Sequence, residues 1–314
     1  MDAEARREAA VERGIRLTPR RWVRRLIAAA LAMAFLGSAA AGDVAANASR
    51  VHGLWVWKGP SLFATAEAAQ RLRDFCRAQG INEVYVSVFD HGQLGETSAL
   101  VRLIDSLHRG GIRVEALLSS TDADEPGKHR ETLLARVRAI ETFNGRYARS
   151  RFDGLHLDIE PQQRPENKGA GNLRFLPDLT AAYRAVRALA EPAGLSVNAD
   201  IQNKLLKGTP AQRRELLQSL PRLTLMLYEV SAGQDAGATA KTEALRAASS
   251  HFLEMAYAGL HDPDVAMLAI GLRTPDYGEL LPQMLRSLDD ANTSNPHYLG
   301  WARHSYNDVV NAAR

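Results

Sequence analysis

The chain has 314 residues, of which 46% are hydrophobic and 24% are charged. This composition is too apolar for an intrinsically disordered chain and too poor in cysteine for a disulfide-stapled scaffold. The single cysteine, Cys76, excludes an intrachain disulfide and a cysteine-rich zinc site. We expect Cys76 to be a small buried side chain on a helix and not a nucleophile.

The formal net charge of +3 arises in the first 41 residues of the chain. These residues hold eight of the 39 basic and four of the 36 acidic side chains, which leaves 31 basic and 32 acidic side chains, a net charge of −1, in the remainder. A nucleic-acid-binding protein needs a strongly basic surface. We therefore expect no nucleic-acid partner.

Residues 1–41 are typical of a secretion signal. The basic segment Arg20–Arg25 precedes the apolar segment Leu26–Gly37 and a run of small residues that ends at Ala41, the expected cleavage site; a second such site ends at Ala48. Twelve apolar residues are too few to span a bilayer, which takes about 20. The paired arginines are also compatible with twin-arginine export. The alternative is an uncleaved anchor, in which case the leader is the only part that contacts a membrane. We expect a periplasmic or secreted protein.

Eight short apolar segments alternate with helical patterns over residues 42–314. The expected strands are Gly53–Trp57, Glu83–Phe89, Ile112–Leu118, Gly154–Ile159, Leu195–Ala199, Leu223–Tyr228, Val265–Gly271 and Tyr298–Trp301. Helical spacing marks Ala66–Ala78 and Ser98–His108 among the intervening stretches. This alternation predicts one α/β domain, a single (β/α)₈ TIM barrel. A doubly wound sheet is the alternative, but no G-x-G-x-x-G turn follows the first strand.

The fourth expected strand carries the most informative residues. Side chains alternate across a strand, so the apolar members of Leu155–Ile159 should face the helices. His156, Asp158 and Glu160 should then point into the barrel, with Glu160 nearest its catalytic end and His156 hydrogen-bonded to Asp158. Two carboxylates that lie close together resist joint ionisation, so the pKa of one of them rises. A glutamic acid that stays protonated for this reason can protonate the oxygen of a leaving group. The alternative is a buried polar ladder that only fixes strand register.

The segment Asp153–Glu160 resembles the D-G-x-D-x-D-x-E signature of the chitinase-like family 18 glycoside hydrolases. The resemblance implies that Glu160 is the general acid and that Asp158 orients the substrate's acetamido group for attack on the anomeric carbon. His156 stands where the family has a further aspartate, so the chain resembles a divergent member or relative. Met226–Glu229 is similar to the family's M-x-Y-D, which implies that Tyr228 positions the substrate.

Other polar and aromatic side chains are expected to line the same pocket and bind the substrate. They are Trp57, Asp90, Asp200, Tyr228, Glu229 and Trp301. Trp57 and Trp301 offer faces on which a sugar ring can stack, and Trp301 matches the tryptophan that floors the sugar subsite in the resembling family. Asp90 and Asp200 follow strands at positions suited to a sugar-hydroxyl acceptor or a second catalytic group. Each residue alone could equally serve barrel packing, but the set suits a carbohydrate.

Other catalytic classes fit the sequence less well. A common retaining glycosidase has a nucleophile after strand seven, but here that strand leads to Arg273. Two mechanisms remain: nucleophilic assistance by the substrate itself, or a second carboxylate, such as Asp200 or Glu229, that works together with Glu160. A cation could be bound where four side chains converge, namely His52, His156, Asp158 and Glu160. No metal-binding spacing appears, so we expect no metal and no cofactor. A serine hydrolase would need G-x-S-x-G, which is absent.

The sequence therefore predicts an exported, monomeric glycoside hydrolase that cleaves a cell-envelope or extracellular polysaccharide by acid catalysis from Glu160. The alternative is a non-catalytic carbohydrate-binding barrel. The substitution at His156 favours that alternative, and the intact pair of Asp158 and Glu160 opposes it.

Overall fold

A closed barrel of eight parallel strands forms the centre of the computed structural model, which describes residues 50–169, 173–228, 230, 236–261 and 264–312. The strands are β1 (Val51–Val56), β2 (Glu83–Ser87), β5 (Arg113–Ser120), β6 (Gly154–Ile159), β7 (Ser196–Gln202), β8 (Arg222–Met226), β9 (Met267–Arg273) and β10 (Tyr298–His304). They pair in chain order, and β10 closes the barrel on β1. The predicted (β/α)₈ barrel is confirmed, and the open doubly wound sheet is wrong.

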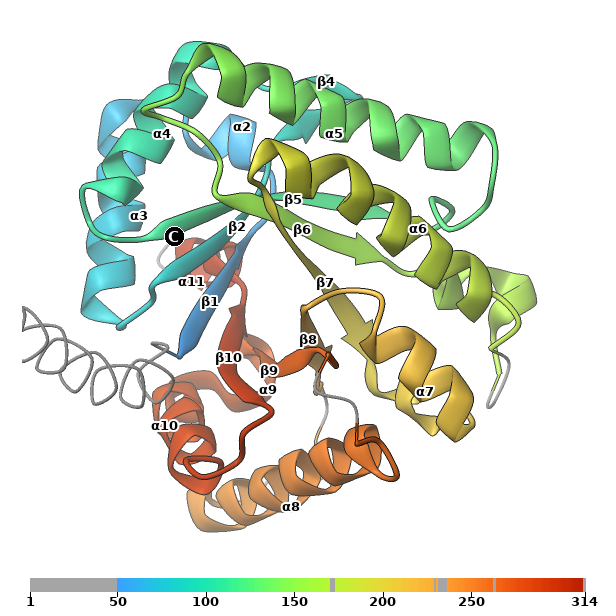
Figure 1. Ribbon diagram of the computed structural model, residues 1–314. Coiled ribbons are helices and arrows are strands. Elements are labelled where there is room, and N and C mark those ends of the chain that lie inside the picture. The colour runs from blue at the N-terminus through green and yellow to red at the C-terminus, as the bar shows by residue number, and fades with distance from the viewer. Residues whose placement is uncertain (1–49, 170–172, 229, 231–235, 262–263, 313–314) are drawn as a thin grey trace, which may run out of the picture. The chain divides into compact units, whose positions relative to one another are not determined.

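Helices surround the strands on the outside of the barrel (Figure 1). The longer ones are α3 (Ala66–Ala78), α4 (Thr97–His108), α5 (Lys128–Arg146), α6 (Leu176–Ala190), α7 (Pro210–Leu217), α8 (Ala238–Tyr257), α10 (Leu281–Ala291) and α11 (Tyr306–Ala312), and the short ones are α2 (Gly59–Leu62) and α9 (Thr274–Tyr277). None of the helices in the described part of the chain combines the length and hydropathy of a membrane span.

Local sequence signals explain where these helices begin and end. The Thr65 side chain accepts a hydrogen bond from the backbone of Ala68 and so caps α3, whose buried face includes Cys76. Glu96 caps α4 in the same way. Gly194 adopts a left-handed backbone conformation (φ +71°) just before β7, which a residue with a Cβ would adopt only at a cost. Cys76 is buried, as predicted, and burial raises the pKa of its thiol to about 12.

The apolar core lies mainly between the strands and the helices, whereas the inside of the barrel is narrow and polar. Trp55 and Tyr85 fill its middle together with Leu117 and Ala302. Glycine makes room for the larger rings, because a Cβ at Gly271 would lie 2.8 Å from the Trp55 ring. The charged side chains Glu83, Glu115 and Arg222 are also among those on the inner face.

Three strand ends differ from the prediction in ways that affect the site. Strand β10 continues three residues beyond Trp301, to His304, and β7 continues to Gln202. Strand β2 ends at Ser87, and the chain then forms a separate two-stranded hairpin, β3 (Phe89–Asp90) with β4 (Gln93–Leu94). The residues that line the carboxyl end of the barrel therefore differ from those expected from the ends of the apolar segments.

Candidate active site

Strand β6 has the predicted bounds and the predicted alternation. Its apolar side chains pack in the core between strands and helices, and His156 is fully buried inside the barrel. Register with β7 pairs His156 with Asn198. The same register continued by two residues puts Asp158 near Asp200, whose charge acts on it. The next pair is Glu160 with Gln202, whose side-chain amide donates to the glutamate over 2.8 Å. The inner faces of β6 and β7 thus form one ladder that rises to the barrel mouth.

The predicted hydrogen bond between His156 and Asp158 is wrong. His156 Nε2 instead lies 2.8 Å from Asp200 Oδ1, and Nδ1 lies 3.3 Å from Glu115 Oε2 on β5. The reason is geometric: inward residues of one strand are about 6.6 Å apart, whereas adjacent strands are about 4.8 Å apart. The imidazole therefore finds its partners across the sheet. Burial opposes its charge, but the two carboxylates outweigh burial and raise the pKa of His156 to about 9.

Asp200 lies inside the barrel and not at its exposed end. Its Oδ2 accepts a hydrogen bond from Trp55 Nε1 over 2.9 Å, and its Oδ1 is held by His156. Only 2% of the residue is exposed. Both oxygens are committed to protein donors, so Asp200 is poorly placed for the predicted role of sugar-hydroxyl acceptor or second catalytic group.

Among the described residues, Asp158 and Glu160 are acids that face the mouth without an ion pair to a cationic side chain. Asp158 Oδ1 is buried and has no hydrogen-bond partner among the described residues. Burial, reinforced by the charges of Asp200 and Glu160, raises the pKa of Asp158 well above its usual range. Burial likewise raises the pKa of Glu160, against the lowering effect of the Gln202 hydrogen bond. The direction agrees with the prediction for Glu160.

Side-chain amides hold the Glu160 carboxylate in place. Gln202 and Gln162 donate to Oε1 over 2.8 and 3.1 Å, and Gln163 donates to Oε2. Lys204 lies near enough to Glu160 to interact electrostatically, but burial lowers the pKa of its ammonium group. These neutral donors orient the carboxyl group without forcing it to ionise, as a full ion pair would.

The mouth also carries an aromatic group that the sequence analysis only partly identified. His304, the last inward residue of β10, accepts a hydrogen bond from Trp57 Nε1 over 2.9 Å and lies 5.9 Å, between ring centroids, from Tyr228. The Arg273 guanidinium lies over the Tyr228 ring at 5.3 Å. Because an indole N–H only donates, His304 Nε2 carries no proton and the ring is neutral; burial lowers its pKa in agreement. The alternation of Gly300, Ala302 and His304 was the signal that could have found it.

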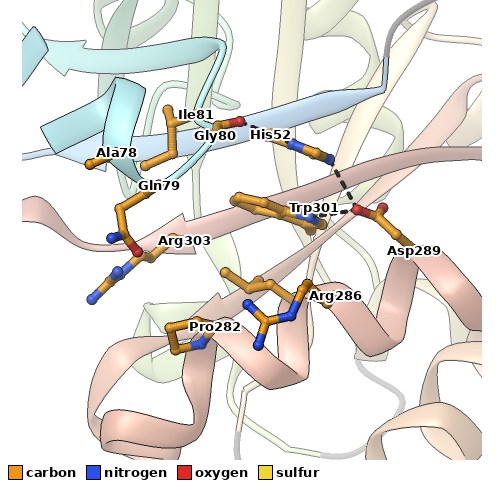
Figure 2. Close-up of a pocket in the computed structure, with 11 residues that line it drawn as sticks. His52, Ala78, Gln79, Gly80, Ile81, Pro282, Arg286, Asp289, Trp301 and Arg303 are labelled. Carbon is orange, nitrogen blue, oxygen red and sulfur yellow. Dashed lines mark hydrogen bonds and ion pairs between the residues drawn. The ribbon is translucent and has the colours of Figure 1, made fainter. Parts of the chain in front are cut away.

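Trp301 lies on the opposite face of β10, so its predicted place in the sugar-binding floor is wrong. Its ring stacks on His52 with centroids 4.2 Å apart, and its Nε1 donates to Asp289 of α10 over 3.0 Å. Figure 2 shows it in a pocket of about 330 Å³ between α10 and the end of α3. The expected strand ended at Trp301, whereas β10 continues for three more residues. The mouth therefore lies beyond Trp301, at the end of the longer strand.

One further expected residue, Asp90, does not join the mouth. Asp90 is exposed on the β3–β4 hairpin, outside the barrel sheet, with His91 at 3.7 Å. Glu229 lies outside the described residues, as does the expected leader over 1–41. His52 packs on Trp301 outside the barrel, so it does not converge with the β6 acids on one cation, and no cluster of metal-binding side chains occurs in the described part of the chain.

Comparison with known proteins supports the fold and not a particular family. No family model and no curated protein matches the sequence. Among solved structures, a GH5_18 variant from Streptomyces cattleya, in complex with Manβ1-4GlcNAc, is similar with a TM-score of 0.57 and 15% identity over 81% of this chain and 71% of that one. An endo-1,4-β-mannanase from Rhizomucor miehei has a TM-score of 0.52 and 8% identity over 82% and 86%.

The PgaB (BpsB) glycoside hydrolase domain from Bordetella bronchiseptica has a TM-score of 0.50 and 12% identity over 83% of this chain and 96% of that domain. These structures are glycoside hydrolase TIM barrels, and their likeness to this chain is one of fold. Family 18 in particular is not singled out among them.

Proposed function

We propose that this protein is an exported glycoside hydrolase that cleaves a polysaccharide containing N-acetylated sugars, with Glu160 as the general acid. One observation carries the proposal. Glu160 follows β6 at the carboxyl end of the barrel, where neutral amides orient it and burial raises its pKa. A carboxylic acid whose pKa is raised and which lies at the carboxyl end of the barrel is suited to protonating a glycosidic oxygen.

The proposed reaction has two steps. Glu160 gives its proton to the glycosidic oxygen, the bond from that oxygen to the anomeric carbon breaks, and the substrate's own acetamido oxygen bonds to that carbon. Glu160, now a carboxylate, takes a proton from a water molecule whose oxygen attacks the anomeric carbon and expels the acetamido oxygen. Asp158, with one oxygen unpartnered inside the protein, orients the acetamido group. Substrate assistance fits a barrel in which β9 ends at Arg273 and supplies no carboxylate nucleophile.

The floor of the sugar site in this proposal is formed by Trp57, His304 and Tyr228. Their rings follow one another across the mouth, with His304 in contact with both neighbours. Flat apolar ring faces bind the C–H faces of pyranose rings through dispersion and burial of apolar surface.

Replacement of Glu160 by glutamine tests the proposal. Glutamine keeps the shape of the side chain but delivers no proton, so turnover should fall by about 10²–10⁴-fold while substrate binding persists. Release of reducing ends from chitin, poly-N-acetylglucosamine and mannan measures turnover, and calorimetry with oligosaccharides measures binding.

Glu254→Gln, a change at an exposed position of α8, is the matched control and should keep wild-type turnover. Equal turnover by Glu160→Gln and wild type would contradict the assignment of the acid. Binding of oligosaccharide with no turnover by the wild type would favour the non-catalytic carbohydrate-binding barrel instead.

A further inference from the structure

Three charged side chains from neighbouring strands form a continuous chain inside the barrel. Glu115 of β5, His156 of β6 and Asp200 of β7 are joined by contacts of 3.3 and 2.8 Å, and at most 1% of each side chain is exposed. At its lower end, Arg222 of β8 lies 3.6 Å from Glu115 and also pairs with Glu83. At its upper end, Asp200 lies near Asp158, and its charge acts on that acid. The chain therefore connects the barrel base to the proposed catalytic acids.

The contacts of His156 define its protonation state. Both ring nitrogens face carboxylate oxygens, which only accept hydrogen bonds, so each nitrogen carries a hydrogen and the ring is an imidazolium. Asn198 Nδ2 lies 3.2 Å from Nδ1, which sets two donors against each other in this state; turning the amide over removes the conflict, because it aims the unpartnered Oδ1 of Asn198 at Nδ1–H.

The position of the ring is fixed as firmly as its charge. It stacks on Tyr85 with centroids 3.6 Å apart and meets Trp55 edge-on at 5.8 Å. Trp55 also donates to the second oxygen of Asp200. The carboxylate of Asp200 is therefore held by two buried donors of fixed orientation and is turned towards the barrel interior, away from any substrate.

The charges that surround the two acids can be named strand by strand. Asp158 and Glu160 meet the negative charge of Asp200 from β7. The positive charge of His156 opposes this effect at Asp158, and that of Lys204, from the segment that follows β7, opposes it at Glu160. Two phenols complete the set, Tyr183 of α6, whose hydroxyl donates to the Asp200 backbone oxygen, and Tyr228 after β8; burial keeps both protonated. Among these neighbours, Asp200 is the fixed anion that raises the proton affinity of both acids.

We propose that His156 is a positioning residue that acts through Asp200: the buried Glu115–His156–Asp200 chain fixes a carboxylate beside Asp158 and below Glu160, so that both acids keep their protons for the reaction. In this view His156 does not stand in for a missing catalytic aspartate. The negative charge comes from β7, and the histidine on β6 holds it there. The inference rests on the proposed function only in giving Glu160 the role of acid.

Titration of carboxyl groups by ¹³C NMR in the full chain tests this inference without any substrate. Asp200→Asn keeps the shape and removes the charge, so the titration midpoints of Asp158 and Glu160 should move to lower pH by about one unit. His156→Gln removes the imidazolium that holds the Asp200 carboxylate beside Asp158, so the influence of that carboxylate should weaken and the midpoints of Asp158 and Glu160 should move in the same direction.

The control is Trp55→Phe, which removes a neutral hydrogen bond to Asp200 and keeps the ion pair. It should move the midpoint of Glu160 much less than Asp200→Asn does. Unchanged midpoints in Asp200→Asn would overturn the inference. A shift to higher pH in His156→Gln would overturn it too, because the direct action of the imidazolium on Asp158 would then outweigh its action through Asp200. Circular dichroism confirms that each variant is folded, and Asp200→Asn suffices if His156→Gln unfolds.

Turnover distinguishes this inference from the proposed function. If the enzyme is active, the alkaline limb of its kcat/KM profile should shift with the NMR midpoints in Asp200→Asn. If no polysaccharide is cleaved but the midpoints still shift, the proposed function fails and the electrostatic role of the buried chain stands.

Discussion

At the scale of single residues, His156 has the largest consequence for the protein. It is a buried imidazolium between two carboxylates, and such a group is stable only while both of its partners remain in place. The pKa values of Asp158 and Glu160 are raised because burial at the same end of the barrel excludes water from their carboxyl groups. The chemistry of the mouth therefore depends on residues that no substrate reaches.

The stability of the fold should fall as the pH rises from about 6.5 to about 9. The pKa of His156 is raised from its usual value to about 9, so the folded chain holds this proton more tightly than the unfolded one. The ion pairs stabilise the fold fully below the unfolded pKa of about 6.5 and lose that contribution as the pH passes the folded value; the difference corresponds to about 3 kcal/mol. The raised pKa values of Asp158 and Glu160 act in the same direction at lower pH.

Urea unfolding at several pH values measures this dependence. The free energy of unfolding should decrease between pH 6.5 and 9, and the decrease should be much smaller in His156→Gln. A wild-type free energy of unfolding that stays constant over this range would show that the imidazole is neutral in the folded protein.

At the scale of one element, β10 separates two tasks between its faces. The inner face presents His304 to the mouth, and the outer face presents Trp301 to α10 through the bond to Asp289. Asp289 also forms hydrogen bonds with the side chains of His52 and Tyr298, so this carboxylate joins β1, β10 and α10. The outer face thus stabilises the barrel where its first and last strands meet.

Paired substitutions on β10 should separate these two tasks. Trp301→Phe removes a hydrogen bond to a carboxylate and should lower the free energy of unfolding by about 1.5–3 kcal/mol, with kcat/KM unchanged. His304→Ala should instead raise KM, because it opens the floor between Trp57 and Tyr228. Denaturation curves and steady-state kinetics of both variants measure the effects. A raised KM in Trp301→Phe would contradict this division and would indicate that Trp301 contacts the sugar.

At the scale of the whole molecule, charge is distributed unevenly along the sequence. Residues 1–41 account for the positive net charge, the remainder is nearly balanced, and the barrel begins at Val51. This distribution agrees with the proposal that the barrel works outside the cytoplasm, where polysaccharide substrates are found.

The exported protein should begin near Gly42 or Ser49. A basic segment, a short apolar segment and small residues together direct cleavage after Ala41 or Ala48. N-terminal sequencing of the protein from the cell envelope or medium of its native host determines the site. Recovery of exported protein that still carries Met1 would show that the leader is an uncleaved anchor.

The sequence by itself determined the barrel and the strand that carries the inward-facing His156 and Asp158. Alternating strand and helix patterns are local properties, and eight of them admit few arrangements other than a closed barrel. The two-residue period of β6 is also local, which is why Leu157 and Asp158 face opposite sides as predicted. The length of β10 was harder to predict, because Arg303 and His304 do not belong to an apolar segment.

Only the tertiary structure decided which charges meet. The partners of His156 lie 41 and 44 residues away in sequence, and strand register and barrel curvature bring them within hydrogen-bond distance. No spacing rule within β6 specifies Glu115 or Asp200, because the distance along a strand exceeds the distance between strands. The sequence therefore placed the acids at the mouth, and closure of the barrel decided which neighbours set their protonation.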